Sequence, residues 1–176
     1  MAETLPTPTP EKSNVLDDNA RKFIVDDIDR AFLDQHCTAS YIMTVDWLET
    51  HEATEKKLAY KKFDSGEVQI LLIEKETVDG KRTSRKDNIT EETYKELLGA
   101  SVLRVEKRRS ELEYVQADIV FTVKFDEFSD STLSVIEIDA PNEDDRKAFK
   151  PEEFPATVKE VTGDIAYYGY RIAAIL

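Results

Sequence analysis

The sequence is poor in cysteine, histidine and glycine: its 176 residues include one cysteine, two histidines and five glycines. The single cysteine, Cys37, excludes an intramolecular disulfide and agrees with a reducing compartment, so we expect a cytoplasmic protein. With only His36 and His51 beside it, the chain has little material for a zinc site or a Cys/His catalytic pair. The glycines show neither GxGxxG nor Walker spacing, which argues against a glycine-rich phosphate loop.

Long apolar runs are also missing. No segment approaches the roughly 20 apolar residues of a membrane-spanning helix, and no secretory signal is recognisable, so we expect a soluble protein without a membrane partner. The first stretch, MAETLPTPTPEKSN, holds three prolines and almost no apolar side chain, which predicts a disordered tail over residues 1–15. Residues 16–176 are long enough to form one domain with a buried core.

Negative charge dominates the chain, whose formal net charge is −13. This charge argues against duplex nucleic acid as a partner, because a phosphate backbone repels an acidic protein that has no concentrated basic surface. The distribution is uneven, however: residues 54–109 hold 14 Lys and Arg against 11 Asp and Glu. The middle of the chain is therefore locally basic, although ordinary solvated strand faces would also account for that excess.

The hydrophobic pattern predicts short strands with a few helices between them. Strand-like segments cover about 21–25, 40–47, 56–63, 68–76, 82–88, 102–109, 117–128 and 132–140, with DSG and VDG as turn signals. Helices are expected over 26–36, from Thr90 to a stop at Gly99, over 142–150 and at the C-terminus, over 163–176. About eight strands joined by short turns indicate an α+β protein with an antiparallel sheet.

Lysine and arginine recur at one parity within several of these strands, and residues two apart in a strand share a face. The segments concerned contribute Lys57 and Lys61, Lys75, Arg82 and Lys86, and Lys107 and Arg109. If eight strands close into a β-barrel, this basic face points inward. An interior with so many like charges must be wet and must bind an anion. A polyphosphate has enough negative charge and suits Lys and Arg donors.

Carboxylates accompany the basic residues near the end of the chain. Asp126 shares parity with Lys124, and Glu137 and Asp139 lie two residues apart in SVIEIDAP. Hard oxygen ligands beside a phosphate site favour Mg²⁺ or Mn²⁺, which bridges phosphate oxygens and activates water. The alternative is that Glu137 and Asp139 belong to an ordinary half-exposed strand.

Several motifs together resemble the CYTH superfamily, the triphosphate tunnel metalloenzymes, over about residues 18–174. VEKRR resembles the I-x-K-x-R strand of that superfamily, KFDEF its E-V-D-x-F strand, IEID its E-x-E strand, and EVTGDIAY its E-V-T-x-D-x-x-Y closing segment. DNARKF is a partial match to the N-terminal E-x-E-x-K-F and supplies Asp18 and Lys22. The resemblance implies an antiparallel eight-stranded closed β-barrel, a triphosphate tunnel, with peripheral helices in a domain over 16–176.

The departures from this pattern fall mainly on carboxylates. Ala20, Ser84, Lys86 and Lys124 stand where the superfamily has acidic residues, and its R-x-R strand becomes Lys57 and Ala59. Residue by residue, the resemblance implies that phosphate is bound by Lys22, Lys57, Lys75, Arg82, Lys107 and Arg109. It implies metal ligands at Asp18, Asp126, Glu137 and Asp139, of which Asp126, Glu137 and Asp139 would be catalytic.

The first hypothesis is a protein that binds a triphosphate-containing small molecule or polyphosphate in a basic tunnel and hydrolyses it with Mg²⁺ or Mn²⁺. If the chain is an enzyme, it is a metal-dependent triphosphatase. The second hypothesis is a catalytically degenerate module that only binds polyphosphate or a nucleotide, and the third is a structural domain whose interior is neutralised by Lys–Asp pairs. Members of the superfamily often pair, so a homodimer is compatible with the resemblance.

Overall fold

The computed structural model describes residues 15–17, 19–51 and 53–176, and side chains from residue 19 onward. Residues 1–14 of the predicted tail and Asp18 lie outside the described residues, and Val15, the last residue of that tail, belongs to a strand. The strands are β1 (Val15–Asp17), β2 (Arg21–Ile28), β3 (Cys37–Thr50), β4 (Thr54–Phe63), β5 (Val68–Val78), β6 (Lys81–Asn88), β7 (Leu103–Gln116), β8 (Ile119–Phe128), β9 (Ser134–Asp139) and β10 (Ala156–Glu160). The helices are α1 (Arg30–His36), α2 (Glu91–Leu98), α3 (Glu143–Ala148) and α4 (Gly169–Ile175), with short 3₁₀ turns at Pro151–Glu153 and Ile165–Tyr167.

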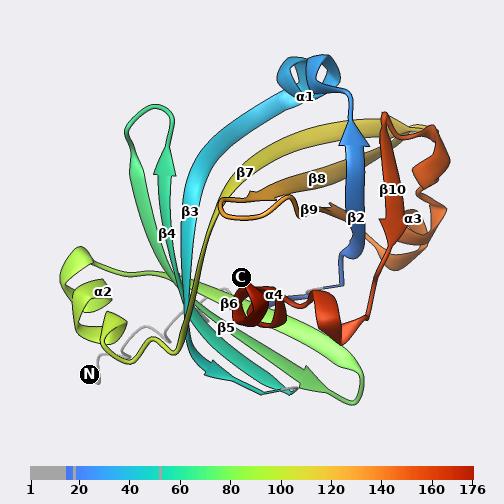
Figure 1. Ribbon diagram of the computed structural model, residues 1–176. Helices are drawn as coiled ribbons and strands as arrows, with labels where there is room; N and C mark the ends of the chain where they lie inside the picture. The colour runs from blue at the N-terminus through green and yellow to red at the C-terminus, as the bar shows by residue number, and fades with distance from the viewer. Residues whose placement is uncertain (1–14, 18, 52) are drawn as a thin grey trace, which may run out of the picture.

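All ten strands form one antiparallel sheet in the order β1-β6-β5-β4-β3-β7-β8-β9-β2-β10 (Figure 1). The eight predicted strands correspond to β2–β9, but the prediction of a closed barrel is wrong because the sheet is open. Closure would require β2 to pair with β6. Instead, the free edge of β6 pairs with β1, and the free edge of β2 pairs with β10. Within the described ranges, no pairing joins β1 to β10.

The open sheet nevertheless curves strongly, because the chain itself joins its two ends. Residue Asp17 pairs in β1 with Thr83 of β6, and Arg21 pairs in β2 with Ile138 of β9. Four residues of extended chain span at most about 14 Å, so the β6 edge and the β2 edge must lie near each other. The sheet is therefore curved into a partly closed shape, and α4 lies on its concave face (Figure 1).

Local signals explain several element boundaries. Thr90 Oγ1 accepts a hydrogen bond from Thr93 N at 3.1 Å, so the predicted N-cap of α2 is confirmed. The strand expected from residue 117 begins two residues later, because Ala117 and Asp118 have φ of 49° and 63° and form the β7–β8 hairpin turn. The helix expected over 26–36 is shorter, because β2 continues to Ile28 and Asp29 caps α1.

The C-terminal segment also differs from the prediction of one helix over 163–176. Strand β10, which was not predicted, is followed by the 3₁₀ turn Ile165–Tyr167 and then by α4. Gly169 begins α4 and lies against Trp47, where a side-chain Cβ would come within 3.0 Å of the indole. Among the described residues, no helix is long and apolar enough to span a membrane.

Each face of the sheet buries its own apolar core, as expected when alternate residues point to opposite sides. On the concave face, α4 packs on residues of β3, β4, β5 and β7, and this core includes Tyr41, Trp47, Val105, Tyr170 and Ile172. On the convex face, α1 and the segment after α3 cover β2, β7, β8 and β9, and the core there includes Leu33, Phe121, Val123, Phe149 and Phe154.

Two valines of β8 test the importance of the convex core. Val123 is fully buried, whereas Val120 is 47% exposed. We expect Val123→Ala to lower the free energy of unfolding by about 2 kcal/mol, because two buried methyl groups are lost and a cavity remains. The matched change Val120→Ala should cost less than about 0.5 kcal/mol. Equal midpoints for both variants in urea denaturation would contradict the assignment of this core.

Candidate anion-binding cavity

The concave face encloses a cavity of about 440 Å³ that β2 through β9 and the start of α4 line. Along each strand, alternate side chains point into it: Lys75 and Thr77 from β5, Lys107 and Arg109 from β7, and Lys124 and Asp126 from β8. The structure brings all six residues that were predicted to bind phosphate to this one cavity, namely Lys22, Lys57, Lys75, Arg82, Lys107 and Arg109. Their role in binding stays a prediction.

Positive charge dominates the lining of this cavity. Its basic members are the six predicted residues together with Lys86 and Lys124, and its acidic members are Glu55, Asp126, Glu137 and Asp164. Among the described lining residues, eight basic and four acidic side chains give an excess of four positive charges, in a chain whose net charge is −13. The protein therefore concentrates positive charge at one internal place while the rest of the chain is strongly acidic.

Glu55 of β4 neutralises part of this charge at one end of the cavity. Its carboxylate accepts hydrogen bonds from Lys57 Nζ at 2.5 Å, Arg82 Nη2 at 2.8 Å and Trp47 Nε1 at 2.9 Å. Burial alone would raise the pKa of Glu55, but the charges of Lys57 and Lys75 and the hydrogen bonds lower that pKa to about 2. Glu55 is thus a permanent anion that orients two of the basic side chains.

Asp126 of β8 likewise neutralises two basic side chains of the cavity. Arg109 holds it in a bidentate pair, with Nε–Oδ1 and Nη2–Oδ2 distances of 2.6 Å, and Lys107 Nζ lies 2.7 Å from Oδ2. Burial opposes ionisation, yet Arg109 and Lys107 lower the pKa of Asp126 below its ordinary value. Burial lowers the pKa of Lys107 to about 8, with repulsion from Arg109 adding to the effect.

Glu137 and Asp139 of β9 share a face but not a site. Glu137 lines the cavity with its Oε1 3.7 Å from Lys22 Nζ, and Lys22 also donates to the carbonyl of Tyr167 at 3.0 Å. Asp139 lies outside the cavity lining, at the end of β9, where its Oδ1 is 3.4 Å from Arg146 Nη1. The structure therefore brings Asp126 and Glu137 together and leaves Asp139 apart from both.

Lys86 of β6 and Lys124 of β8 differ from the other basic residues. Within the described residues, the ammonium group of neither lysine has a carboxylate within 4.0 Å or a hydrogen-bond partner. Partial removal from water lowers the pKa of Lys86 to about 8, and repulsion from Lys124, Lys75, Lys61 and Arg109 adds to this effect. Lys86 is exposed at the cavity mouth, where an anion from solvent can reach it.

Glu55, Lys86 and Lys124 were not among the predicted site residues, although their spacing contained the necessary signal. Glu55 shares parity with Lys57, Lys86 with Arg82, and Lys124 with Asp126, so each lies on the cavity face of its strand. The sequence interpretation placed Lys86 on the basic inward face and noted that Lys124 shares parity with Asp126, but it assigned neither to phosphate binding because both depart from the CYTH pattern. In the structure they are two further basic side chains of the cavity.

The carboxylates that the structure describes do not fit a divalent metal ion. No group of three or more Asp, Glu, His or Cys side chains in the described part of the chain is arranged to hold a metal. Both oxygens of Asp126 are bound by Arg109 and Lys107, and Asp139 lies outside the cavity. A hard cation such as Mg²⁺ requires free oxygen ligands in octahedral geometry, which these residues do not provide.

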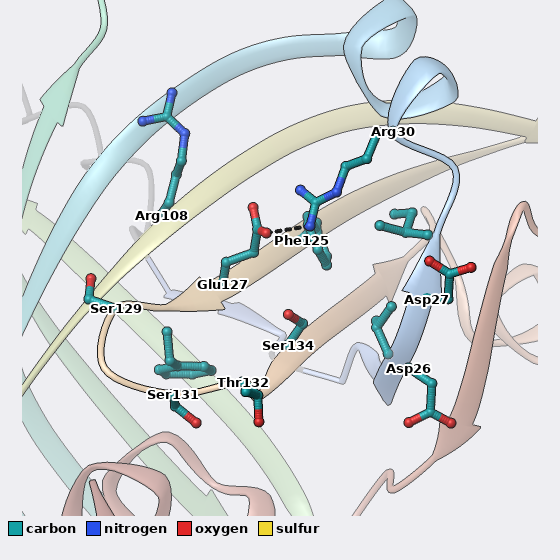
Figure 2. Close-up of a pocket in the computed structure, with 13 residues that line it drawn as sticks. Asp26, Asp27, Arg30, Arg108, Phe125, Glu127, Ser129, Ser131, Thr132 and Ser134 are labelled. Atoms are coloured by element: carbon teal, nitrogen blue, oxygen red, sulfur yellow. Dashed lines mark hydrogen bonds and ion pairs between the residues drawn. The ribbon is translucent and has the colours of Figure 1, made fainter.

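A second depression is lined by Phe125 and Glu127 of β8, among other residues (Figure 2). These two residues alternate along β8 with Lys124 and Asp126 of the cavity, so this depression lies on the opposite, convex face. Two of its described lining residues are basic, Arg30 and Arg108, and three are acidic. Both arginines are already paired: Arg30 with Glu127 at 2.6 Å, and Arg108 with Asp64 at 2.8 Å. This depression has no excess of positive charge, so the concave cavity is the better candidate for binding anions.

The buried Arg109–Asp126 pair should matter for stability more than an exposed pair of the same type. We expect Asp126→Asn to lower the free energy of unfolding by about 3 kcal/mol, because it leaves the Arg109 guanidinium buried without its counter-charge. Asp64→Asn, which removes the exposed partner of Arg108, should cost about 0.5 kcal/mol or less. Urea titrations of both variants measure the difference, and a small effect of Asp126→Asn would show that Arg109 is solvated.

Comparison with solved structures shows the kind of fold that surrounds this cavity. A crystal structure of the inorganic triphosphatase NE1496 is 21% identical, covers 88% of this chain and 92% of its own, and has a TM-score of 0.55. A second crystal structure of NE1496 is 22% identical and covers 88% and 95%, with the same TM-score. The PH1819 protein from Pyrococcus horikoshii OT3 is 17% identical and covers 72% of this chain and 80% of its own, with a TM-score of 0.50.

No family model and no curated protein match the chain. The chain therefore has a fold similar to that of an inorganic triphosphatase.

Proposed function

We propose that the protein binds a triphosphate-containing small molecule or inorganic polyphosphate in the concave cavity, as a divergent relative of the CYTH superfamily. The observation that carries this proposal is the excess of basic over acidic side chains, by four, among the described lining residues, with Lys86 and Lys124 outside every described ion pair. Like charges held together at the edge of a protein interior are costly unless an anion joins them. A triphosphate group brings about four negative charges at neutral pH, which equals that excess.

The donor types and the size of the cavity also favour this class of ligand. Arg82 and Arg109 offer planar guanidinium groups, and the lysines offer ammonium groups that bind phosphate oxygens from other directions. A volume of about 440 Å³ suits a small molecule. Duplex nucleic acid does not fit between the strands, and the net charge of −13 repels it.

Hydrolysis of the bound triphosphate is a second candidate function, and the fold similarity to an inorganic triphosphatase favours it. Fold alone does not establish an activity, and the described carboxylates do not form a metal site. The experiment is the release of orthophosphate from tripolyphosphate with Mg²⁺, with Mn²⁺ and with EDTA. Release that depends on metal and is lost in Glu137→Gln would establish an enzyme, whereas no release by a protein that binds the compound would establish a binding module.

Calorimetric titration with tripolyphosphate tests the binding itself. We expect Lys86→Met and Lys124→Met each to weaken the affinity by about tenfold, because each removes one charged donor. The thermal stability of the free protein should stay unchanged or rise, because a repelled charge is removed from the cavity. Lys62→Met is the matched control, since Lys62 is exposed and alternates with Lys61 on β4. Equal affinities for the wild type and both cavity variants would overturn the proposal.

The pH dependence of binding should reveal the lowered pKa of Lys86. That pKa is about 8 in the free protein, so Lys86 is charged at pH 7 and mostly neutral at pH 9. Because an anion binds the charged form, the contribution of Lys86 to affinity is present below pH 8 and is lost as the pH rises through 8. In Lys86→Arg the guanidinium remains charged at both pH values. Affinity should therefore fall more between pH 7 and pH 9 in the wild type than in this variant, and parallel curves would contradict the assignment.

A further inference from the structure

We infer that the cavity binds its triphosphate as the metal-free anion, with Lys86 and Lys124 supplying the charge that a divalent cation would otherwise provide. This inference rests on the proposed function and specifies the ionic form of the ligand. It has a direct consequence: Mg²⁺ should compete with the protein for the triphosphate.

First, the protein's own cations already occupy two of the four described carboxylates of the cavity, Asp126 and Glu55. Asp126 receives three hydrogen bonds from Arg109 and Lys107, and Glu55 receives three from Lys57, Arg82 and Trp47. Asp164 accepts from the backbone of Ala166 and caps the following 3₁₀ turn. A metal ion at Asp126 or Glu55 would have to displace their donors, which would leave buried ammonium and guanidinium groups without a partner.

Second, Glu137, another described carboxylate of the lining, lies in a strongly positive field. Burial would raise the pKa of Glu137, but Lys22, Arg109, Lys75 and Lys124 hold it well below its ordinary value. The same positive charges that stabilise the Glu137 carboxylate repel a divalent cation that approaches it. Lys86 and Lys124 strengthen this repulsion, because no described carboxylate neutralises either of them.

Third, the charge balance distinguishes the two forms of the ligand. A metal-free triphosphate group carries about four negative charges, whereas its Mg²⁺ complex carries about two. Among the described lining residues, basic side chains outnumber acidic ones by four, so the free anion neutralises more of that excess than the complex does. The cavity should therefore select the free anion from a mixture of the two forms.

The test is a calorimetric titration of tripolyphosphate into the full chain, first in EDTA and then in excess Mg²⁺, with NaCl added so that both buffers have the same ionic strength. We expect binding in EDTA and an apparent affinity at least tenfold lower in Mg²⁺. Equal or tighter binding in Mg²⁺ would overturn this inference while leaving the proposed function intact. Absence of binding in both buffers would overturn the proposed function and this inference together.

Charge reversal supplies the second arm of the test. The double variant Lys86→Glu/Lys124→Glu turns the two unpaired cations into carboxylates, so its affinity for tripolyphosphate should be lowest in EDTA and should increase when Mg²⁺ is added. Lys62→Glu, on the convex face of β4, changes the net charge without changing the cavity and should behave as the wild type does. A double variant that folds, as circular dichroism would show, and still binds more weakly in Mg²⁺ than in EDTA would contradict the role of these lysines. The wild-type titration decides the inference even if the double variant does not fold.

Discussion

The architecture of this protein depends on the neutralisation of positive side chains on the inner face of a curved sheet. Eight basic side chains line one small cavity. Bringing so many cations together and away from water opposes folding unless negative charges lie among them. Glu55 and Asp126 are those negative charges, and each forms ion pairs with two cations. These pairs allow the sheet to fold around the cavity before any ligand binds.

Among the described residues, these ion pairs do not include Lys86 and Lys124, whose positions differ from those of the paired cations. The paired residues lie deep in the sheet, where Arg109 and Asp126 are almost fully buried. Lys86, in contrast, is exposed at the mouth of the cavity, and Lys124 faces it from another strand. The cations that the protein leaves uncompensated are thus partly accessible to solvent, where the cost of holding them is smallest and an anion can reach them.

The sequence predicted the polarity of this face better than it predicted the closure of the sheet. Alternation along a strand is a local property, so Lys57, Lys107 and Arg109 could be assigned to one face from their spacing alone. Closure depends on which edges pair. The sequence interpretation included neither β10 nor β1, and the predicted tail ended at Val15, the first residue of β1. These two strands occupy the edges that a barrel would join. Parity could not separate Asp139 from Glu137 either, because the two residues share a face of β9. Asp139 lies outside the cavity because it is the last residue of β9, beside Arg146.

The same reasoning explains why the acidic residues of the cavity do not imply a metal site. A carboxylate in a basic cavity has two uses: it can bind a metal ion, or it can neutralise neighbouring cations so that the protein folds. Sequence alone does not distinguish these uses, because both require an acidic residue at the same parity. The hydrogen bonds distinguish them, since an Asp126 whose two oxygens already accept from Arg109 and Lys107 has no free site for a metal. In this chain, Glu55 and Asp126 therefore neutralise neighbouring cations, while Lys86 and Lys124 form no described ion pair.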